Sequence, residues 1–224
     1  MSTERRRASR MTGQQRREQL LSVGRALFAE KGFDGTSVEE IAARAKVSKP
    51  VVYEHFGGKE GMYAVVVDRE VQRLTSTLTE ALQRGGHPRV IVERTTLALL
   101  DYVEAEGDGF RILVRDSPVA QSTGTFSSLI GDVAVEVEHL LANEFRKTGL
   151  DPATAPIYAQ MLVGMIALTG QWWLDARKPK KSVVAAHLVN LAWNGLHQME
   201  KNPKIRFTDR EAPADGSSPA EDPL

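Results

Sequence analysis

Almost every segment of this chain spaces its apolar residues as a helix requires, and this periodicity most constrains the fold. Between residues 12 and 31 the apolar residues fall on one helical face: Leu20, Leu21, Val23, Leu27 and Phe28. The same period predicts two short helices before residue 57 and longer ones over 59–82, 89–105, 109–116, 125–148, 153–177 and 181–201. Strand signals are scarce, so the sequence predicts an all-α protein of about nine helices.

Three helices are expected in the first 60 residues, and the second and third are joined by a tight turn. Thr36 or Ser37 offers an N-cap to the second helix, because hydroxyl oxygens accept hydrogen bonds from first-turn amides. After the turn at 46–48, the third helix runs to about Phe56, with Pro50 in its first turn. Two helices joined in this way predict a helix-turn-helix, whose second helix enters the major groove of DNA.

Four motifs between residues 28 and 63 carry a resemblance to a known family. They are Phe28-Ala-Glu-Lys-Gly-Phe33, Thr36-Ser-Val-Glu-Glu-Ile-Ala42, Ala45-Lys-Val-Ser-Lys-Pro-Val-Val-Tyr-Glu-His-Phe56 and Gly58-Lys-Glu-Gly-Met-Tyr63. This stretch resembles the helix-turn-helix of the TetR family of bacterial transcriptional repressors. Lys46 and Pro50 stand where the family more often has glycine. Lys46 is therefore expected to adopt a positive φ, or the turn to take a different shape.

The resemblance implies a set of DNA contacts around the third helix. Lys49, Pro50 and Val51 are the candidates for base edges, since an ammonium can donate to guanine and apolar groups fit thymine methyls. The other candidates are expected to contact phosphates or to begin a helix beside them. The full predicted DNA-binding set is Thr36, Arg44, Ser48, Lys49, Pro50, Val51, Tyr53, His55 and Lys59.

Beyond residue 80 the resemblance concerns architecture only, and it implies a ligand pocket and a homodimer. Aromatic and Met residues with a few polar groups are typical of such a pocket, although most aromatic residues at helical spacing belong to a core. The candidate ligand-binding residues are Arg111, Arg115, Phe126, Tyr158, Met161, Met165, Gln171, Trp172 and His187. The last two helices are expected to pair with their symmetry mates through Gly164, Ala167, Gly170, Trp193 and Leu196. The expected ligand is a largely apolar small molecule, and no metal or cofactor is expected.

Charge is unevenly distributed although 29 basic residues balance 29 acidic ones. Residues 1–61 carry 12 Lys or Arg and 8 Asp or Glu, a net charge of +4, and the remainder carries −4. The predicted division is a disordered basic arm (1–11), the helix-turn-helix domain (12–58), a helical ligand-binding and dimerisation domain (59–202) and a disordered acidic tail (203–224). The basic arm is a candidate for additional phosphate contacts.

Other classes of protein are disfavoured by the residues present. With no cysteine there is no disulfide framework and no thiolate metal site. Glu136-Val-Glu-His139 matches half of a di-iron motif, but a second copy is missing, so a helical-bundle metalloenzyme is a weak alternative. A DNA-packaging protein without sequence preference is the other alternative. The apolar stretch 158–174 is interrupted by polar residues and predicts a buried helix rather than a membrane span, so a cytoplasmic regulator is expected.

Overall fold

The computed structural model describes residues 11–115 and 126–204. Within these ranges the regular structure is entirely helical, which confirms the predicted fold class. Nine α-helices are described: α1 (Gly13–Lys31), α2 (Val38–Ala45), α3 (Lys49–Phe56), α4 (Lys59–Gln83), α5 (Pro88–Ala105), α6 (Gly107–Val114), α8 (Phe126–Thr148), α9 (Ala155–Ala176) and α10 (Lys181–His197). A 3-10 turn at Pro152–Thr154 precedes α9.

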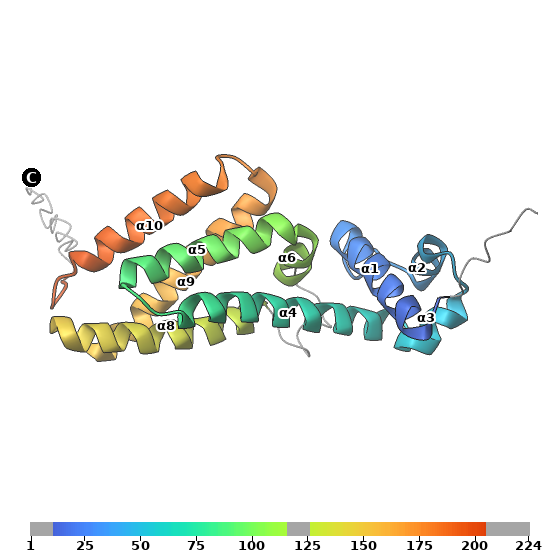
Figure 1. The fold of residues 1–224 in the computed structure, drawn as a ribbon, viewed down its shortest axis with the longest axis horizontal. Helices are drawn as coiled ribbons and strands as arrows, with labels where there is room; N and C mark the ends of the chain where they lie inside the picture. The colour runs from blue at the N-terminus through green and yellow to red at the C-terminus, as the bar shows by residue number, and fades with distance from the viewer. Residues whose placement is uncertain (1–10, 116–125, 205–224) are drawn as a thin grey trace, which may run out of the picture.

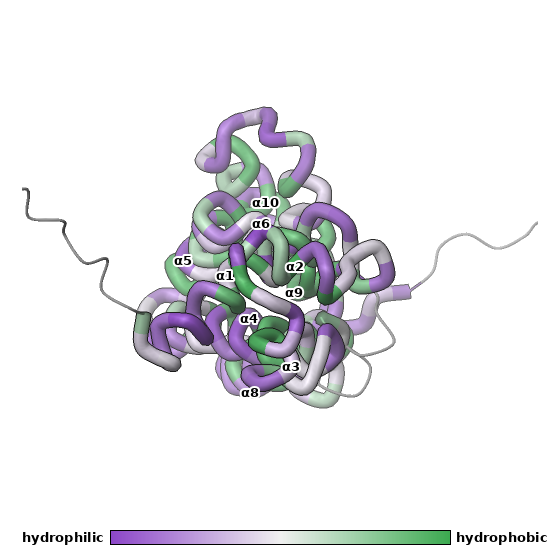
Figure 2. The backbone as a smooth tube through the Cα atoms, turned by 90° about the vertical axis from the view of Figure 1, so that its right-hand side faces the viewer, coloured by the Kyte–Doolittle hydropathy of each residue, from purple (hydrophilic) through white to green (hydrophobic). Residues whose placement is uncertain are grey.

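The molecule is elongated, with a small helical bundle at one end and a larger one at the other. Helices α1–α3 form the small bundle, and α4 runs from it along the body (Figure 1). The body contains α5, α8, α9 and α10, and α6 lies between α1 and the body. Viewed from the end that carries α1–α3, hydrophilic and hydrophobic residues follow one another along the helices (Figure 2), as amphipathic helices require. The described chain therefore has two bundles joined by one continuous helix.

The small bundle has a compact apolar core to which every one of its helices contributes. Leu20, Leu27, Ile41, Val52 and Met62 are completely buried, and they come from α1, α2, α3 and the start of α4. Burial of such a side chain stabilises the fold by about 1.5–3 kcal/mol. This core fixes α3 against α1 and α2, so the opposite face of α3 is left to solvent.

The turn before α3 depends on a residue in the left-handed region. Lys46 has φ 57° and ψ 46°, so of the two expected alternatives the turn takes the one with a positive φ. Its backbone N–H lies within hydrogen-bonding range of the carbonyls of Ala42 and Ala43, and this arrangement ends α2. The chain can therefore reverse direction within a few residues and begin α3 at Lys49.

Helix α9 is two-sided rather than buried, in contrast to the expectation from sequence. Among the described residues, Pro152–Ala176 is one helical stretch with the length and composition of a membrane span. One side of this helix packs along α8 and α5, while Ile157, Met161, Leu168 and Trp172 are exposed on the other. Packing against α8 and α5 explains the inner side of α9, but it does not explain the exposed apolar residues on the other side.

Candidate functional site

The first two turns of α3 carry exposed residues of the types that contact DNA. Ser48, Lys49, Pro50 and Tyr53 are exposed, and 54% of the Tyr53 surface is accessible. Ser48 caps the helix through its extended backbone without a side-chain capping bond. Lys49 forms an ion pair with the exposed Glu39 of α2. These four predicted residues therefore belong to α3 and its N-cap, and α3 lies at the end of the molecule that carries the small bundle (Figure 1).

Three other predicted residues have roles within the bundle as well. Val51 is half-buried and packs against the apolar core. It therefore has less exposed surface for base contacts than its exposed neighbours Lys49 and Pro50. His55 is half-buried, and its carbonyl accepts a hydrogen bond of 2.8 Å from Arg17 of α1. Lys59 donates to the carbonyl of Phe33 at 3.1 Å, and its Nζ lies 4.3 Å from the centroid of the Phe33 ring. Val51 and Lys59 therefore help to hold the bundle together.

Thr36 is the member of the predicted set that the structure contradicts. Only 2% of its surface is exposed, and its hydroxyl donates to the carbonyl of Gly32 at 2.8 Å. Ser37 provides the N-cap of α2 instead, accepting from the amide of Glu40 at 3.2 Å. Because the Thr36 hydroxyl is buried inside the α1–α2 turn, it cannot contact a phosphate. The sequence offered two adjacent hydroxyl residues, and only the tertiary packing decided which faced inwards.

Basic residues flank the exposed face of α3. Arg44 is exposed on α2 and pairs with Glu30 at 3.0 Å, an arrangement that water and salt weaken readily. Arg17, at the start of α1, lies 4.4 Å from the centroid of the Phe56 ring while it bonds the end of α3. The arginines of the predicted basic arm before residue 11, and most of the predicted acidic tail, lie outside the described residues.

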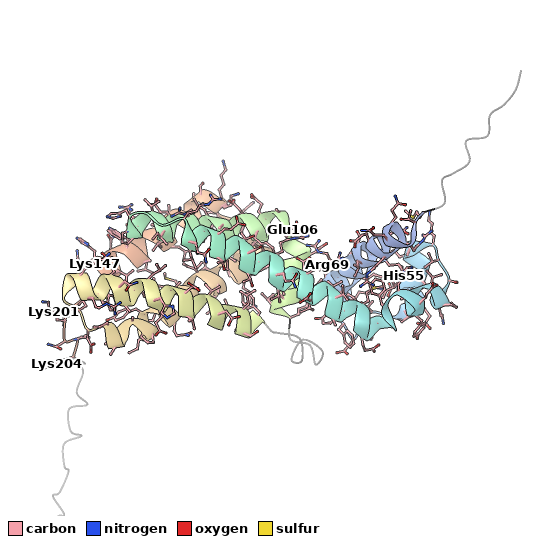
Figure 3. All side chains as sticks on the ribbon, turned by 60° about the horizontal axis from the view of Figure 1, so that its bottom comes forward. His55, Arg69, Glu106, Lys147, Lys201 and Lys204 are labelled. Carbon is pink, nitrogen blue, oxygen red and sulfur yellow. The ribbon has the colours of Figure 1, made fainter. Side chains whose placement is uncertain are left out.

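A large cavity in the body is lined by α4, α5, α8, α9 and α10. Its volume is about 690 Å³, which is ample for a small molecule. Its inner walls are apolar, and polar residues come from the turn after α4 and from the far ends of α8 and α10. Lys147 marks this outer end, far from His55 and the small bundle (Figure 3). The representative inner residues are Leu74, Leu78, Leu99, Phe126, Leu129, Val133, Val163 and Ile166.

Of the residues predicted to bind a ligand, Phe126 is the one found among the residues that line this cavity. Arg111 pairs with Asp175 at 3.1 Å, and Arg115 donates to the carbonyl of Ala29 at 2.9 Å. The two arginines thus serve contacts between helices, which corrects their assignment to the pocket. The other predicted residues lie outside the lining: Tyr158, Met161, Met165, Gln171, Trp172 and His187.

Several lining residues could not be recognised from the sequence. Aliphatic residues such as Leu78 and Val133 have the same helical spacing whether they fill a core or border a cavity. Thr95 is the exception, because a threonine among the apolar residues of a helix can be recognised in the sequence. Its surface is 8% exposed, and its hydroxyl has no hydrogen-bond partner among the described residues.

The residues predicted to form the dimer interface have different surroundings in the structure. Trp193 and Leu196 line the cavity, as does the buried Ala167. Gly170 faces α5, since a Cβ there would lie 3.1 Å from Leu99 Cδ2. Gly164 alone has open space where a Cβ would be. The exposed apolar side chains on these helices are instead Ile157, Met161, Leu168 and Trp172 of α9, with Val183 and Leu191 of α10.

A buried carboxylate joins the small bundle to the body. Glu70 of α4 is 3% exposed, and it accepts hydrogen bonds from Arg25 Nε at 2.8 Å and from the Tyr102 hydroxyl at 2.7 Å. Burial and the nearby Glu70 charge raise the pKa of the Tyr102 phenol, so the phenol stays protonated and donates. Arg25 also pairs with Glu106 at 2.7 Å. Helices α1, α4 and α5 thus share one hydrogen-bonded cluster.

A second contact links this cluster to the cavity. The ring of Phe110 in α6 packs edge-on against Phe126, with centroids 5.4 Å apart, and its centroid lies 6.3 Å from that of Tyr102. Phe126 lines the cavity. A Cβ at Gly109 would overlap the Glu70 carboxylate, so glycine there lets α6 approach the cluster. Contiguous contacts therefore connect the cavity wall to α1.

The chain is similar to bacterial regulators along almost its whole length. Residues 20–66 match the family described as "Bacterial regulatory proteins, tetR family", and residues 88–195 match "Tetracyclin repressor-like, C-terminal domain". The HTH-type transcriptional activator FasR of Mycolicibacterium smegmatis is 30% identical over 196 residues, covering 85% of this chain and 87% of its own. The chain belongs to the TetR family. It is a helix-turn-helix transcriptional regulator and not an enzyme.

Two further relatives agree with this assignment. A TetR-like transcriptional regulator from Rhodococcus sp. RHA1 superposes with a TM-score of 0.72 at 26% identity, covering 85% of this chain and 100% of that one. The HTH-type transcriptional repressor Rv3405c of Mycobacterium tuberculosis is 37% identical over 75 residues, 34% of this chain and 37% of its own. The exposed face of α3 is therefore a candidate DNA-binding surface.

Proposed function

We propose that this TetR regulator binds a palindromic operator as a homodimer in the cytoplasm and responds to a small molecule bound in its cavity. The observation that carries the proposal is the coexistence of an exposed α3 face and a 690 Å³ cavity, joined by the continuous helix α4. A protein that only packages DNA has no use for such a cavity. The two predicted alternatives, a packaging protein and a metalloenzyme, have no comparable support.

The contacts to DNA are assigned from exposure. Lys49 and Pro50 meet base edges in the major groove, where Lys49 exchanges its ion pair with Glu39 for a guanine or a phosphate. Ser48 and Tyr53 donate to phosphates, and Arg44 exchanges Glu30 for another phosphate. Each added phosphate contact steepens the salt dependence of operator binding by about one unit of log slope.

The homodimer is assigned to the exposed apolar side chains of α9 and α10. Four of them, spaced four, seven and four residues apart, form one stripe along α9: Ile157, Met161, Leu168 and Trp172. Val183 and Leu191 extend the apolar surface on α10. A twofold axis would bring identical stripes together and place the two α3 helices at neighbouring major grooves.

The effector acts by favouring one orientation of the small bundle over another. A largely apolar ligand in the cavity contacts Phe126, whose ring packs against Phe110 and so reaches the Glu70 cluster. Only a difference in ligand affinity between the two conformations can change operator affinity. Helix α4 spans the cavity wall and the small bundle, so it carries this difference to α3.

The direction of control has two candidates. The resemblance of the sequence favours repression, and Rv3405c, similar over about a third of this chain, is named a repressor. FasR, similar over 85% of this chain, is named an activator, and this similarity favours activation. A reporter gene placed behind the selected operator distinguishes the two, since deleting the regulator gene raises expression under repression and lowers it under activation.

The decisive test of DNA recognition is Tyr53→Ala. Operator fragments are first selected from the genome of the source organism by binding to the purified protein. The variant is expected to lose operator binding at least tenfold in fluorescence anisotropy, because an exposed side chain on the recognition face is removed. Leu97→Ala, an exposed apolar residue of α5, is the control and keeps full affinity. Equal operator affinity of Tyr53→Ala and the unaltered protein, with both folded and dimeric, would contradict the assignment of α3.

A further inference from the structure

An acidic side chain of α2 lies beside the residues of α3 that are proposed to contact DNA. Glu39 belongs to the first turn of α2, and 60% of its side chain is exposed. Its carboxylate forms an ion pair with Lys49, the first residue of α3, across the helix-turn-helix. Because the two charged groups are in contact, DNA that meets the Lys49 ammonium also meets the Glu39 carboxylate.

The packing of α2 and the ion pair fix both the position and the charge of Glu39. The residues that α2 buries are Val38, Ile41, Ala42 and Ala45. Glu39 lies outside this buried set and is exposed to solvent. The hydrogen bond from Lys49 holds the pKa of the Glu39 carboxyl below its ordinary value. At neutral pH the group is therefore an ionised acceptor with no proton to donate.

An ionised carboxylate at this place distinguishes the chemical groups that DNA presents. Phosphates repel it, and phosphates supply essentially all of the affinity for DNA of unrelated sequence. In the major groove the carboxylate can accept a hydrogen bond from the N4 amino group of cytosine, while a lysine can donate to O6 and N7 of guanine. A glutamate and a lysine in contact therefore match the donor and the acceptors of one G·C pair.

Glu40, the next residue, separates this role from a role in helix stability. It is also acidic and also lies in the first turn of α2, but it pairs with Lys31 in the last turn of α1. Both carboxylates are favourable at the N-terminus of α2, where the helix dipole attracts negative charge. A contribution to the stability of α2 would be common to both residues, whereas contact with α3 distinguishes Glu39 from Glu40.

We infer that Glu39 is a specificity-determining residue that accepts a hydrogen bond from the N4 amino group of an operator cytosine while Lys49 donates to the paired guanine. The inference rests on the proposed function, in which α3 enters the major groove. It adds a base-contacting residue outside α3 and names the base pair that this residue selects, one G·C pair in each half-site. Where DNA offers no cytosine at that position, the carboxylate stays unpaired and weakens binding.

The test compares Glu39→Ala with Glu40→Ala in the full-length protein. Each protein selects its preferred sites from a pool of random duplexes, and fluorescence anisotropy then measures its affinity for the operator and for a scrambled duplex of the same composition. Glu39→Ala is expected to lose the preference for a G·C pair at one position of each half-site. It should also lower the ratio of operator affinity to scrambled-duplex affinity about tenfold, as for one base contact. Glu40→Ala, which removes the same charge from the same turn, keeps both the preference and the ratio.

Each outcome decides the inference. Loss of the G·C preference in Glu39→Ala but not in Glu40→Ala, with both variants folded in circular dichroism, supports it. Unchanged preferences in Glu39→Ala overturn it but leave α3 as the proposed recognition helix. The same loss in Glu40→Ala also overturns it, because the effect would then reflect the stability of α2. Failure of the unaltered protein to select any sequence overturns the inference together with the proposed function.

Discussion

At the residue scale, two positions have an unfavourable local free energy, one from the backbone conformation and one from an unpaired hydroxyl. Lys46 keeps a left-handed backbone that glycine adopts without strain. Thr96 keeps a hydroxyl that the described residues leave without a partner. Both costs can be measured by substitution, because neither residue is part of the exposed face of α3.

Lys46→Gly is expected to raise the free energy of unfolding by roughly 0.5–1 kcal/mol. The gain from relieving the positive φ exceeds the larger backbone entropy that glycine has in the unfolded chain. Denaturant unfolding followed by circular dichroism measures the change. Lys46→Ala removes the same side chain but keeps the backbone strain, so an equal gain in that variant would show that strain is not the cause.

Thr96→Val is expected to leave the free energy of unfolding unchanged or to raise it by about 1 kcal/mol. Valine has nearly the same shape and removes the unpaired hydroxyl, whereas most substitutions at a fully buried position destabilise. Thermal unfolding provides the comparison. Destabilisation by more than about 1 kcal/mol would mean that the hydroxyl has a partner in the folded protein.

At the scale of elements, the contact of α1 with α4, α5 and α6 decides how the small bundle sits on the body. The cluster around Glu70 combines a buried carboxylate with the half-buried Arg25 and with Tyr102. By contrast, Glu18 of α1 and Arg69 of α4 form a bidentate pair that is exposed, at 2.7 and 2.8 Å. Both ion pairs join α1 to α4, but Glu70 is buried whereas Glu18 is exposed.

Glu70→Gln is therefore expected to destabilise the protein by roughly 2–4 kcal/mol, because Arg25 loses its buried partner and keeps only the half-buried Glu106. Hydrogen exchange should increase in α1 and α6 and remain unchanged in α10. Glu18→Gln is the matched control and should cost less than about 1 kcal/mol, since water screens an exposed pair. Similar losses in the two variants would show that the buried cluster has no special role in joining the bundles.

At the scale of the whole molecule, the apolar stripe of α9 is the feature left unexplained by the monomer. Met161 and Leu168 are 62% and 66% exposed, although they belong to one of the most apolar helices of the chain. Burying such side chains against an identical stripe removes apolar area from water at roughly 25 cal/mol per Å². The outer end of the body, marked by Lys147, Lys201 and Lys204, lies away from α1–α3 (Figure 3).

The double variant Met161→Arg, Leu168→Arg is expected to be monomeric in light scattering coupled to size exclusion, because two charges in each stripe would face their copies across the twofold axis. Its operator affinity should fall with the loss of the second half-site. Val135→Arg places a charge on an exposed apolar residue of α8 and should remain dimeric. A dimeric double variant would locate the interface on another face.

The sequence by itself determined the helices and the recognition motif, because both depend on local patterns. Apolar period and glycine or proline breaks placed the described helices to within a few residues, and a positive φ at Lys46 was one of the two shapes expected for the turn. Lys49 and Tyr53 were predicted to contact DNA because the sequence around the third helix resembles the recognition helix of the TetR family.

Only the tertiary structure decided which faces of the helices look inwards, since that choice depends on neighbours distant in sequence. Thr36 and Ser37 are equivalent caps until the turn buries one of them. Trp193 and Leu196 have the spacing of an interface but border the cavity, while Leu168 has the spacing of a core but faces solvent. An apolar residue has the same period whether it meets a core, a cavity or a second subunit, and the packing of helices decides which.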